Sequence, residues 1–153
     1  MHLATEHPSN KGVLEYLCRD GKPKKPLIEP AAASKSTWHT GSHPEIVEYL
    51  WDSVTQHLPA DCRAAVCGTP ALVAPVGGVI FAVALGTEYG LRLPPPEFEL
   101  ARTAGAEIVH HYRTVDVTLD LAQTFGDGWV FGLFDQREPE WCVAALRYAE
   151  EKS

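Results

Sequence analysis

The longest uninterrupted apolar run of the chain is Val79–Leu85, in which every position is hydrophobic. A strand with one solvated face alternates apolar and polar residues, whereas a strand covered on both faces does not. Glycine-containing turns flank the run, at Pro75–Gly78 and at Gly86–Glu88. The pattern predicts a central, fully buried strand in a sheet around which the fold is organised.

Short apolar runs on either side of this strand predict its neighbours. Ala64–Cys67 and Ala71–Ala74 are separated by a Gly-Thr-Pro turn. In Tyr89–Leu93 the apolar positions alternate with Gly90 and Arg92, which predicts one buried face and one solvated or functional face. Such short connections favour antiparallel pairing.

Two further strands are expected in the C-terminal half. Thr114–Leu121 alternates strictly between polar and apolar residues, and the apolar run Trp129–Phe134 predicts a second buried strand. The segment LDLAQTFG, Leu119–Gly126, also fits a short helix that ends at a glycine, and periodicity does not decide between the two.

The clearest helix is His43–Leu58. Ser42 followed by Glu45 three residues later is a capping-box pattern, and Pro44 is tolerated in a first helical turn. One face of this helix is continuously apolar, which indicates that it covers the sheet. Similar patterns predict helices over Asn10–Asp20, Glu97–Ala104 and Pro139–Glu150.

These elements predict an α+β fold, in which a mainly antiparallel sheet with hairpins packs against two or three helices, with a helical arm at the N-terminus. Residues 22–40 are rich in proline and small polar residues, which is typical of an extended or mobile segment. We therefore divide the chain into an N-terminal arm, residues 1–40, and a single α+β domain, residues 41–153.

The chain carries a net charge of -7 at pH 7 over 153 residues. An acidic surface repels phosphate backbones and anionic membranes, which argues against nucleic acid as a partner. The basic cluster Lys22–Lys25 lies in the proline-rich segment and is interpreted as a solvated linker. No apolar run approaches the roughly 20 residues that cross a bilayer, so no membrane association is expected. The expected partner is a protein or a small-molecule ligand.

No hydrophobic signal region opens the sequence, which favours a cytoplasmic location. In that compartment the four cysteines are expected to be reduced. Cys18 and Cys142 fall in predicted helices and are interpreted as small core residues.

The best candidates for chemistry are His110–Arg113 together with Asp116. A histidine beside a carboxylate and an arginine can transfer a proton or bind an anion. On a strand, His110 and Tyr112 share one face, while His111 and Arg113 share the other. The alternative is that these residues form the polar face of an edge strand. No residue is therefore assigned as catalytic, and His110, His111 and Asp116 stay candidates.

Cys67 is a further candidate nucleophile, with His110 as its base, because the two need only be close in space. Its surroundings, VCGTP, do not indicate an activated thiol. The pairs Cys62/Cys67 and His39/His43 offer sulfur and nitrogen ligands, but structural zinc sites prefer closer pairs such as Cys-x2-Cys. No metal and no cofactor is therefore expected.

Aromatic and basic side chains outside the predicted core are the candidates for binding. Trp38 lies in the arm, where it must either dock onto the domain or contact a partner. Arg92, Arg102 and Arg113 could together line an anion-binding groove. We take Arg92, Arg113, Tyr112 and Trp38 as candidate ligand-binding residues. The remaining tryptophans occupy apolar faces and are expected in the core: Trp51, Trp129 and Trp141.

Several motifs occur in a recognisable order: a Gly-Gly turn into VIFAVAL, a hairpin into GLRLPP, a helix ending in Gly-Ala, and GWVFG before a terminal helix. Over about residues 44–150 this order resembles the TfoX N-terminal and YjbR-like domains. The resemblance implies a small α+β domain without catalytic residues, linked in some members to transcriptional regulation or competence. The matching positions are Gly77, Gly78, Phe81, Ala82, Leu91, Arg92, Gly105, Ala106, Gly128, Trp129 and Val130.

Two classes of function follow. The one we expect is a small non-catalytic binding or regulatory module, acting through a groove beside the sheet or through the arm. The alternative is a small enzyme or metal-dependent protein that uses His110 and His111 with Cys67 or Asp116. It predicts that these residues converge in one pocket.

Overall fold

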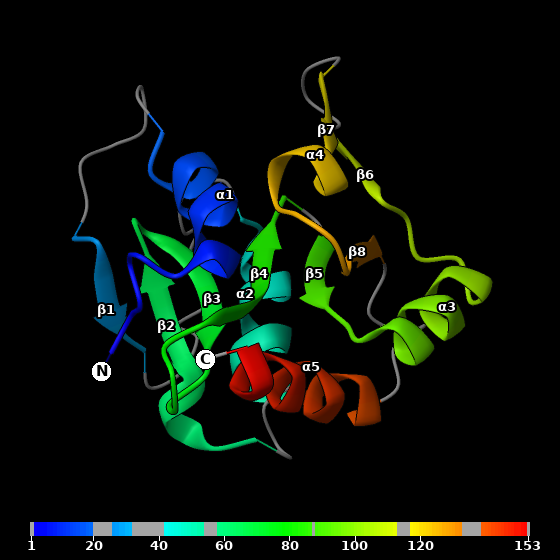
Figure 1. The fold of residues 1–153 in the computed structure, drawn as a ribbon. Coiled ribbons are helices and arrows are strands. Elements are labelled where there is room, and N and C mark those ends of the chain that lie inside the picture. Colours follow the sequence, from blue (N-terminus) through cyan, green and yellow to red (C-terminus); the bar gives the residue numbers. More distant parts are fainter. Residues whose placement is uncertain are drawn as a thin grey trace.

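The computed structural model describes residues 2–19, 26–31, 42–53, 58–86, 88–112, 117–132 and 139–152. Their centre is a six-stranded sheet in the order β1-β2-β3-β4-β5-β8, antiparallel at every neighbouring pair (Figure 1). The predicted α+β class is therefore confirmed. The strands of this sheet are β1 (Ile28–Pro30), β2 (Arg63–Val66), β3 (Thr69–Val73), β4 (Ile80–Leu85), β5 (Glu88–Arg92) and β8 (Trp129–Gly132).

The remaining elements surround this sheet. A separate two-stranded ribbon pairs β6 with β7. The segment 119–126, which periodicity left open, divides between the end of strand β7 and the short helix α4. The bounds are β6 (Val109–Tyr112), β7 (Val117–Asp120), α1 (Pro8–Leu17), α2 (Pro44–Glu48), η1 (Tyr49–Ser53), η3 (Ala60–Cys62), α3 (Pro95–Thr103), α4 (Leu121–Thr124) and α5 (Pro139–Lys152).

Strand β4 is central, as its unbroken apolar run predicts. All six of its residues are buried, and they divide between two hydrophobic cores. The first core joins the sheet to α2, η1 and α5, and includes Val47, Leu50, Leu72, Phe81, Tyr89, Leu91, Trp141 and Ala145. The second core joins the opposite positions of the sheet to α1 and the end of α4, and includes Val13, Leu17, Ile80, Val83, Phe125, Trp129 and Phe131.

The helix expected over His43–Leu58 differs from the prediction in its cap and in the backbone geometry of its second half. Its N-cap is His43, whose Nδ1 accepts a hydrogen bond from the backbone N–H of Glu45 at 3.2 Å. Ser42 is buried instead, and its hydroxyl donates to the carbonyl oxygen of Ala84 in the sheet. The α-helical geometry ends at Glu48 and continues as the π-helical segment η1. Residues 54–57 lie outside the described part of the chain.

Strand β5 also departs from the prediction on its second face. Tyr89 and Leu91 are buried in the first core as expected. Gly90, however, is covered by its cross-strand partner Phe131, since a Cβ on Gly90 would lie 2.5 Å from that ring. Only the two ends of the strand, at Glu88 and Arg92, keep partial exposure on this face.

The N-terminal residues contact the sheet closely. Helix α1 contributes Val13 and Leu17 to the second core, and β1 pairs with β2 as an edge strand. Asn10 of α1 is fully buried and hydrogen bonds to the turn before β4. The segment 22–40 was expected to be extended or mobile, and its described part, residues 26–31, contains a strand of the main sheet.

Two of the four cysteines form a disulfide, so the expectation that all four are reduced is wrong. Cys18, at the C-terminal end of α1, is bonded to Cys67 in the turn between β2 and β3. Cys18 is exposed and is not the core residue that its predicted helix suggested. Cys62 and Cys142 are buried and take no part in a disulfide, which agrees with the core interpretation of Cys142.

None of the described helices has both the length and the apolar character of a membrane span.

Candidate functional site

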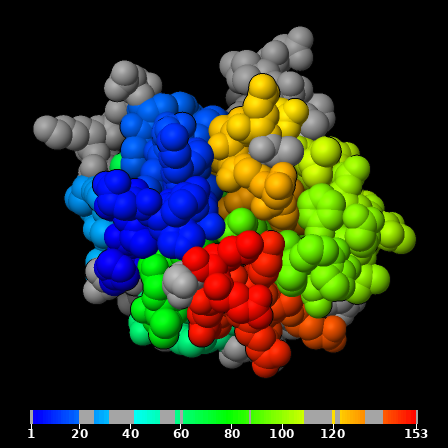
Figure 2. All heavy atoms as spheres, viewed as in Figure 1, coloured from blue at the N-terminus to red at the C-terminus, as the bar shows by residue number. Residues whose placement is uncertain are grey.

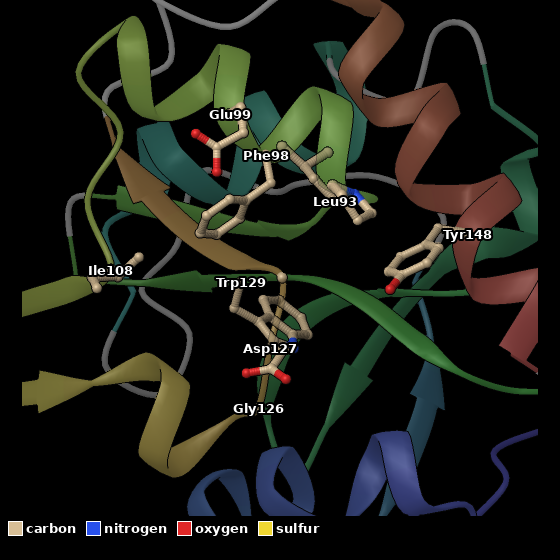
Figure 3. A pocket seen from close by; sticks show the side chains of 10 residues that line it. Leu93, Phe98, Glu99, Ile108, Gly126, Asp127, Trp129 and Tyr148 are labelled. Carbon is tan, nitrogen blue, oxygen red and sulfur yellow. The ribbon is translucent and has the colours of Figure 1, made fainter.

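A cleft lies where β5 ends and β8 begins. Three segments enclose it: the start of α3, the turn 126–128 that leads into β8, and Tyr148 on α5 (Figure 3). In the space-filling view, α3, the region of α4 and β8, and α5 meet on one face of the molecule (Figure 2). The cavity measures about 320 Å³, which is within the size range of small-molecule sites.

The geometry of the turn explains how these segments come together. The backbone N–H of Leu93 donates to the carbonyl oxygen of Gly128 at 2.8 Å, which extends the pairing of β5 with β8 into the turn. Gly128 has φ 93, and a Cβ there would lie 2.9 Å from the Leu93 carbonyl oxygen. Only glycine fits this close approach without strain. Pro95 then starts α3 at once, so that the first turn of the helix overhangs the cleft.

The wall of the cleft is mainly apolar and aromatic. Phe98 and Ile108 lie on one side, and Trp129 and Tyr148 on the other (Figure 3). The two charged residues of the lining, Glu99 and Asp127, are exposed to solvent. The cleft can therefore hold an apolar group in its interior, while the acidic charges lie at the solvent.

Arg92 lies beside this wall, paired across the strands with Trp129. Its Nε donates to the carbonyl oxygen of Asp127 at 3.3 Å, and its guanidinium carbon lies 5.2 Å from the ring centroid of Tyr148. Its Nη1 is buried and has no hydrogen-bond partner among the described residues. Burial lowers the pKa of Arg92, and the nearby Tyr148 and Asp127 act in the opposite direction.

Trp129 presents a second buried donor without an acceptor. The residue is 1% exposed, and its ring packs edge-on against Phe125, with the centroids 5.2 Å apart. Its Nε1 has no hydrogen-bond partner in the described part of the chain. An unmatched buried donor is uncommon in proteins and requires an explanation. Here two of them belong to one cross-strand pair at the edge of a cleft.

Of the predicted binding residues, Arg92 is the one that the structure places at this site. Arg102, expected in the same groove, donates instead to the carbonyl oxygen of Ala106 at 2.6 Å, where it closes the C-terminal end of α3. Arg113 and Trp38 lie outside the described residues. Tyr112 belongs to β6, and its side chain is not described.

The candidates for chemistry are not brought together in the described part of the chain. His110 and His111 are consecutive residues of β6, where they pair with Leu119 and Thr118, and their side chains are not described. Asp116 lies outside the described residues. Cys67 is bonded to Cys18, so its sulfur is not a thiolate nucleophile while that bond is intact.

Metal ligands are not clustered within the described ranges either. No group of three or more His, Cys, Asp or Glu side chains is placed there to hold an ion. His43, one of the proposed ligands, uses its Nδ1 to cap α2, and His39 is not described.

Sequence reasoning missed most of the cleft wall. No periodic apolar pattern in the sequence singles out Phe98 or Ile108 as part of a binding site. Tyr148 lies off the apolar face predicted for α5. The sequence feature that could have located the cleft is the Gly-Asp-Gly-Trp turn, whose tryptophan lies opposite Arg92. Both are visible in the sequence, but the pairing of β5 with β8 is not.

No protein-family model matches this sequence, and neither a curated protein nor a solved structure is significantly similar to it. The resemblance to TfoX N-terminal and YjbR-like domains therefore stays a prediction.

Proposed function

We propose that the protein is a small non-catalytic binding module whose site is the cleft between α3, α5 and the turn 126–128. The observation that carries this proposal is a cavity of about 320 Å³ with a largely apolar and aromatic wall. Clefts of this size and character are the usual sites of small-molecule binding. The ligand is a compact molecule with an apolar body.

A binding role also agrees with the chemistry near the cleft. The polar groups of its lining are two exposed carboxylates, the hydroxyl of Tyr148 and the indole of Trp129, and the adjacent Arg92 has a buried Nη1 without an acceptor among the described residues. None of these is a nucleophile activated by an adjacent base, which acyl-transfer and similar reactions require.

The test is an NMR titration of the ¹⁵N-labelled protein with 2-naphthylacetamide, a neutral aromatic compound small enough for the cavity. We expect shifts concentrated at Phe98, Ile108, residues 126–129 and Tyr148. Glu99→Trp places a large ring over the cleft and should weaken binding about tenfold or more. Leu100→Trp is the matched control, because Leu100 is exposed on the same helix and does not line the cleft.

The proposal fails if the probe leaves the cleft residues unchanged at about 1 mM, a concentration that detects weak sites. It also fails if both tryptophan variants weaken binding equally.

A further inference from the structure

The cleft ends beside two hydrogen-bond donors that nothing in the described chain satisfies. Arg92 Nη1 and Trp129 Nε1 are both buried and without an acceptor. Because the two residues face each other across β5 and β8, their side chains start from neighbouring positions on one face of the sheet. A single oxygen-bearing group placed between them could accept from both.

The positive charge of Arg92 indicates that this oxygen-bearing group of the ligand is an anion. A guanidinium stays protonated at neutral pH even where burial lowers its pKa. Its contacts in the structure are with the backbone carbonyl group of Asp127 and with an aromatic ring. The exposed carboxylate of Asp127 acts on it electrostatically, but the buried Nη1 has no acceptor among the described residues. A partly buried charged group with an unsatisfied donor is unfavourable. A carboxylate oxygen accepts a charge-assisted hydrogen bond from a guanidinium N–H, which is stronger than a bond to a neutral acceptor.

From these observations we propose that the ligand of the cleft is a small apolar carboxylate, whose anionic oxygens are bound by Arg92 Nη1 and Trp129 Nε1. This inference rests on the proposed function and names the class of ligand for the same site. The hydrocarbon part fills the space between Phe98, Ile108 and Leu93. The exposed carboxylates of Glu99 and Asp127 stay in water, where salt screens their repulsion of the ligand's carboxylate.

Tyr148 lines the cleft next to Arg92, so we infer that its side chain shifts when the ligand binds. Its half-buried ring lies between two cations, with Arg92 Cζ at 5.2 Å and Lys152 Nζ at 4.9 Å from the centroid. In the proposed complex the Tyr148 ring turns aside, and the ligand carboxylate replaces it as the partner of Arg92.

Three probes with the same ring and different head groups test the inference on the unaltered chain. They are 2-naphthylacetate, 2-naphthylacetamide and 2-(2-naphthyl)ethylamine, titrated under NMR observation. We expect the acetate to bind at least about tenfold more tightly than the amide, and the amine to bind most weakly. The acetate should move the indole N–H resonance of Trp129 further than the amide does at saturation, and this resonance is identified among the four tryptophans by its absence in Trp129→Phe.

Variants of Arg92 provide the second arm. Arg92→Met keeps an unbranched apolar stem and removes the guanidinium with its charge, so acetate and amide should then bind equally. Arg92→Lys keeps the charge but not the planar fork, and should retain only part of the preference.

The outcomes separate this inference from the proposal on which it rests. If no probe binds, both the cleft and the ligand class are wrong. If the amide binds as tightly as the acetate, or the amine binds most tightly because the acidic rim dominates, the cleft stands and the carboxylate class is wrong. The comparison on the unaltered chain does not depend on the folding of any variant.

Discussion

The side chain of Asn10 holds the backbone of Gly78, 68 residues further along the chain, through a hydrogen bond of 3.0 Å from its Nδ2 to the Gly78 carbonyl oxygen. The same amide nitrogen donates to the Ala4 carbonyl oxygen at 2.7 Å, and its Oδ1 accepts from the backbone N–H of Ile80 at 2.9 Å. One fully buried amide thus links the N-terminal segment to the turn before the central strand. The N-terminal segment is therefore part of the packing of the sheet.

Replacing this amide should destabilise the whole fold. Asn10→Ala removes the buried acceptor of the Ile80 N–H and the donor to the carbonyl oxygens of Gly78 and Ala4. We expect a loss of about 2–4 kcal/mol in the free energy of unfolding, measured by urea denaturation. Lys11→Ala, at the exposed neighbouring position, should change it by less than about 0.5 kcal/mol. Equal effects of the two substitutions would contradict the role given to Asn10.

Gly12 should be intolerant of alanine although it lies inside a helix. Alanine at a helical glycine normally stabilises by about 1 kcal/mol. Here a Cβ would lie 2.1 Å from the carbonyl oxygen of Thr124, because α1 approaches α4 closely at this point. We expect Gly12→Ala to lower the free energy of unfolding by about 1–3 kcal/mol. Glu15→Ala, on the exposed side of α1, is the control, and a stabilising Gly12→Ala would show that the helices are not in contact.

The fold was predictable wherever one local pattern decides the structure. Val79–Leu85 is apolar throughout, and the structure buries it on both faces. The π-helical continuation after Glu48 was not predictable, because it keeps the same apolar residues directed at the sheet with a different backbone hydrogen-bond pattern. His43 replaced Ser42 as the helix cap because the Ser42 hydroxyl donates to Ala84, a contact that depends on tertiary structure.

The candidate site was predictable only in part, for a similar reason. Arg92 was identified because it interrupts an apolar alternation. Its partner Trp129 was assigned to the core, which is correct, but its unmatched Nε1 is visible only once β5 pairs with β8. The bond between Cys18 and Cys67 spans 49 residues, and no spacing rule identifies a single pair of that kind.

This disulfide gives a count of reactive thiols that can be checked directly. Without reductant, the native protein should show no rapidly reacting thiol, because Cys62 and Cys142 are buried. Unfolding should expose these two, and unfolding after reduction should expose all four cysteines of the chain. Four reactive thiols in the unreduced, unfolded protein would show that Cys18 and Cys67 are not bonded.

Breaking the same bond should weaken the attachment of α1. A disulfide that closes a loop of 49 residues lowers the entropy of the unfolded chain. In the chain-entropy description this stabilises the folded protein by about 4 kcal/mol. We expect the double variant Cys18→Ser, Cys67→Ser to unfold at a lower urea concentration, with a free energy of unfolding lower by about 2–4 kcal/mol. The reduced unaltered protein should behave in the same way. An unchanged midpoint in both would mean that the contacts of Asn10 and the second core hold α1 without the bond.

The free thiol of Cys62 should make stability depend on pH in the alkaline range. Burial is the main cause that raises its pKa to about 12, and Asp61 and Glu150 add to the effect. In the unfolded chain the thiol ionises near its ordinary value of 9.0, so the unfolded state loses its proton first as the pH rises. The stabilisation is therefore complete below about pH 9 and is lost as the pH rises towards 12. Cys62→Ala removes this group, and the free energy of unfolding of the variant should fall less steeply than that of the unaltered protein between these values. Parallel curves, or a native thiolate absorbance that appears near pH 9, would show that Cys62 is not shielded from water.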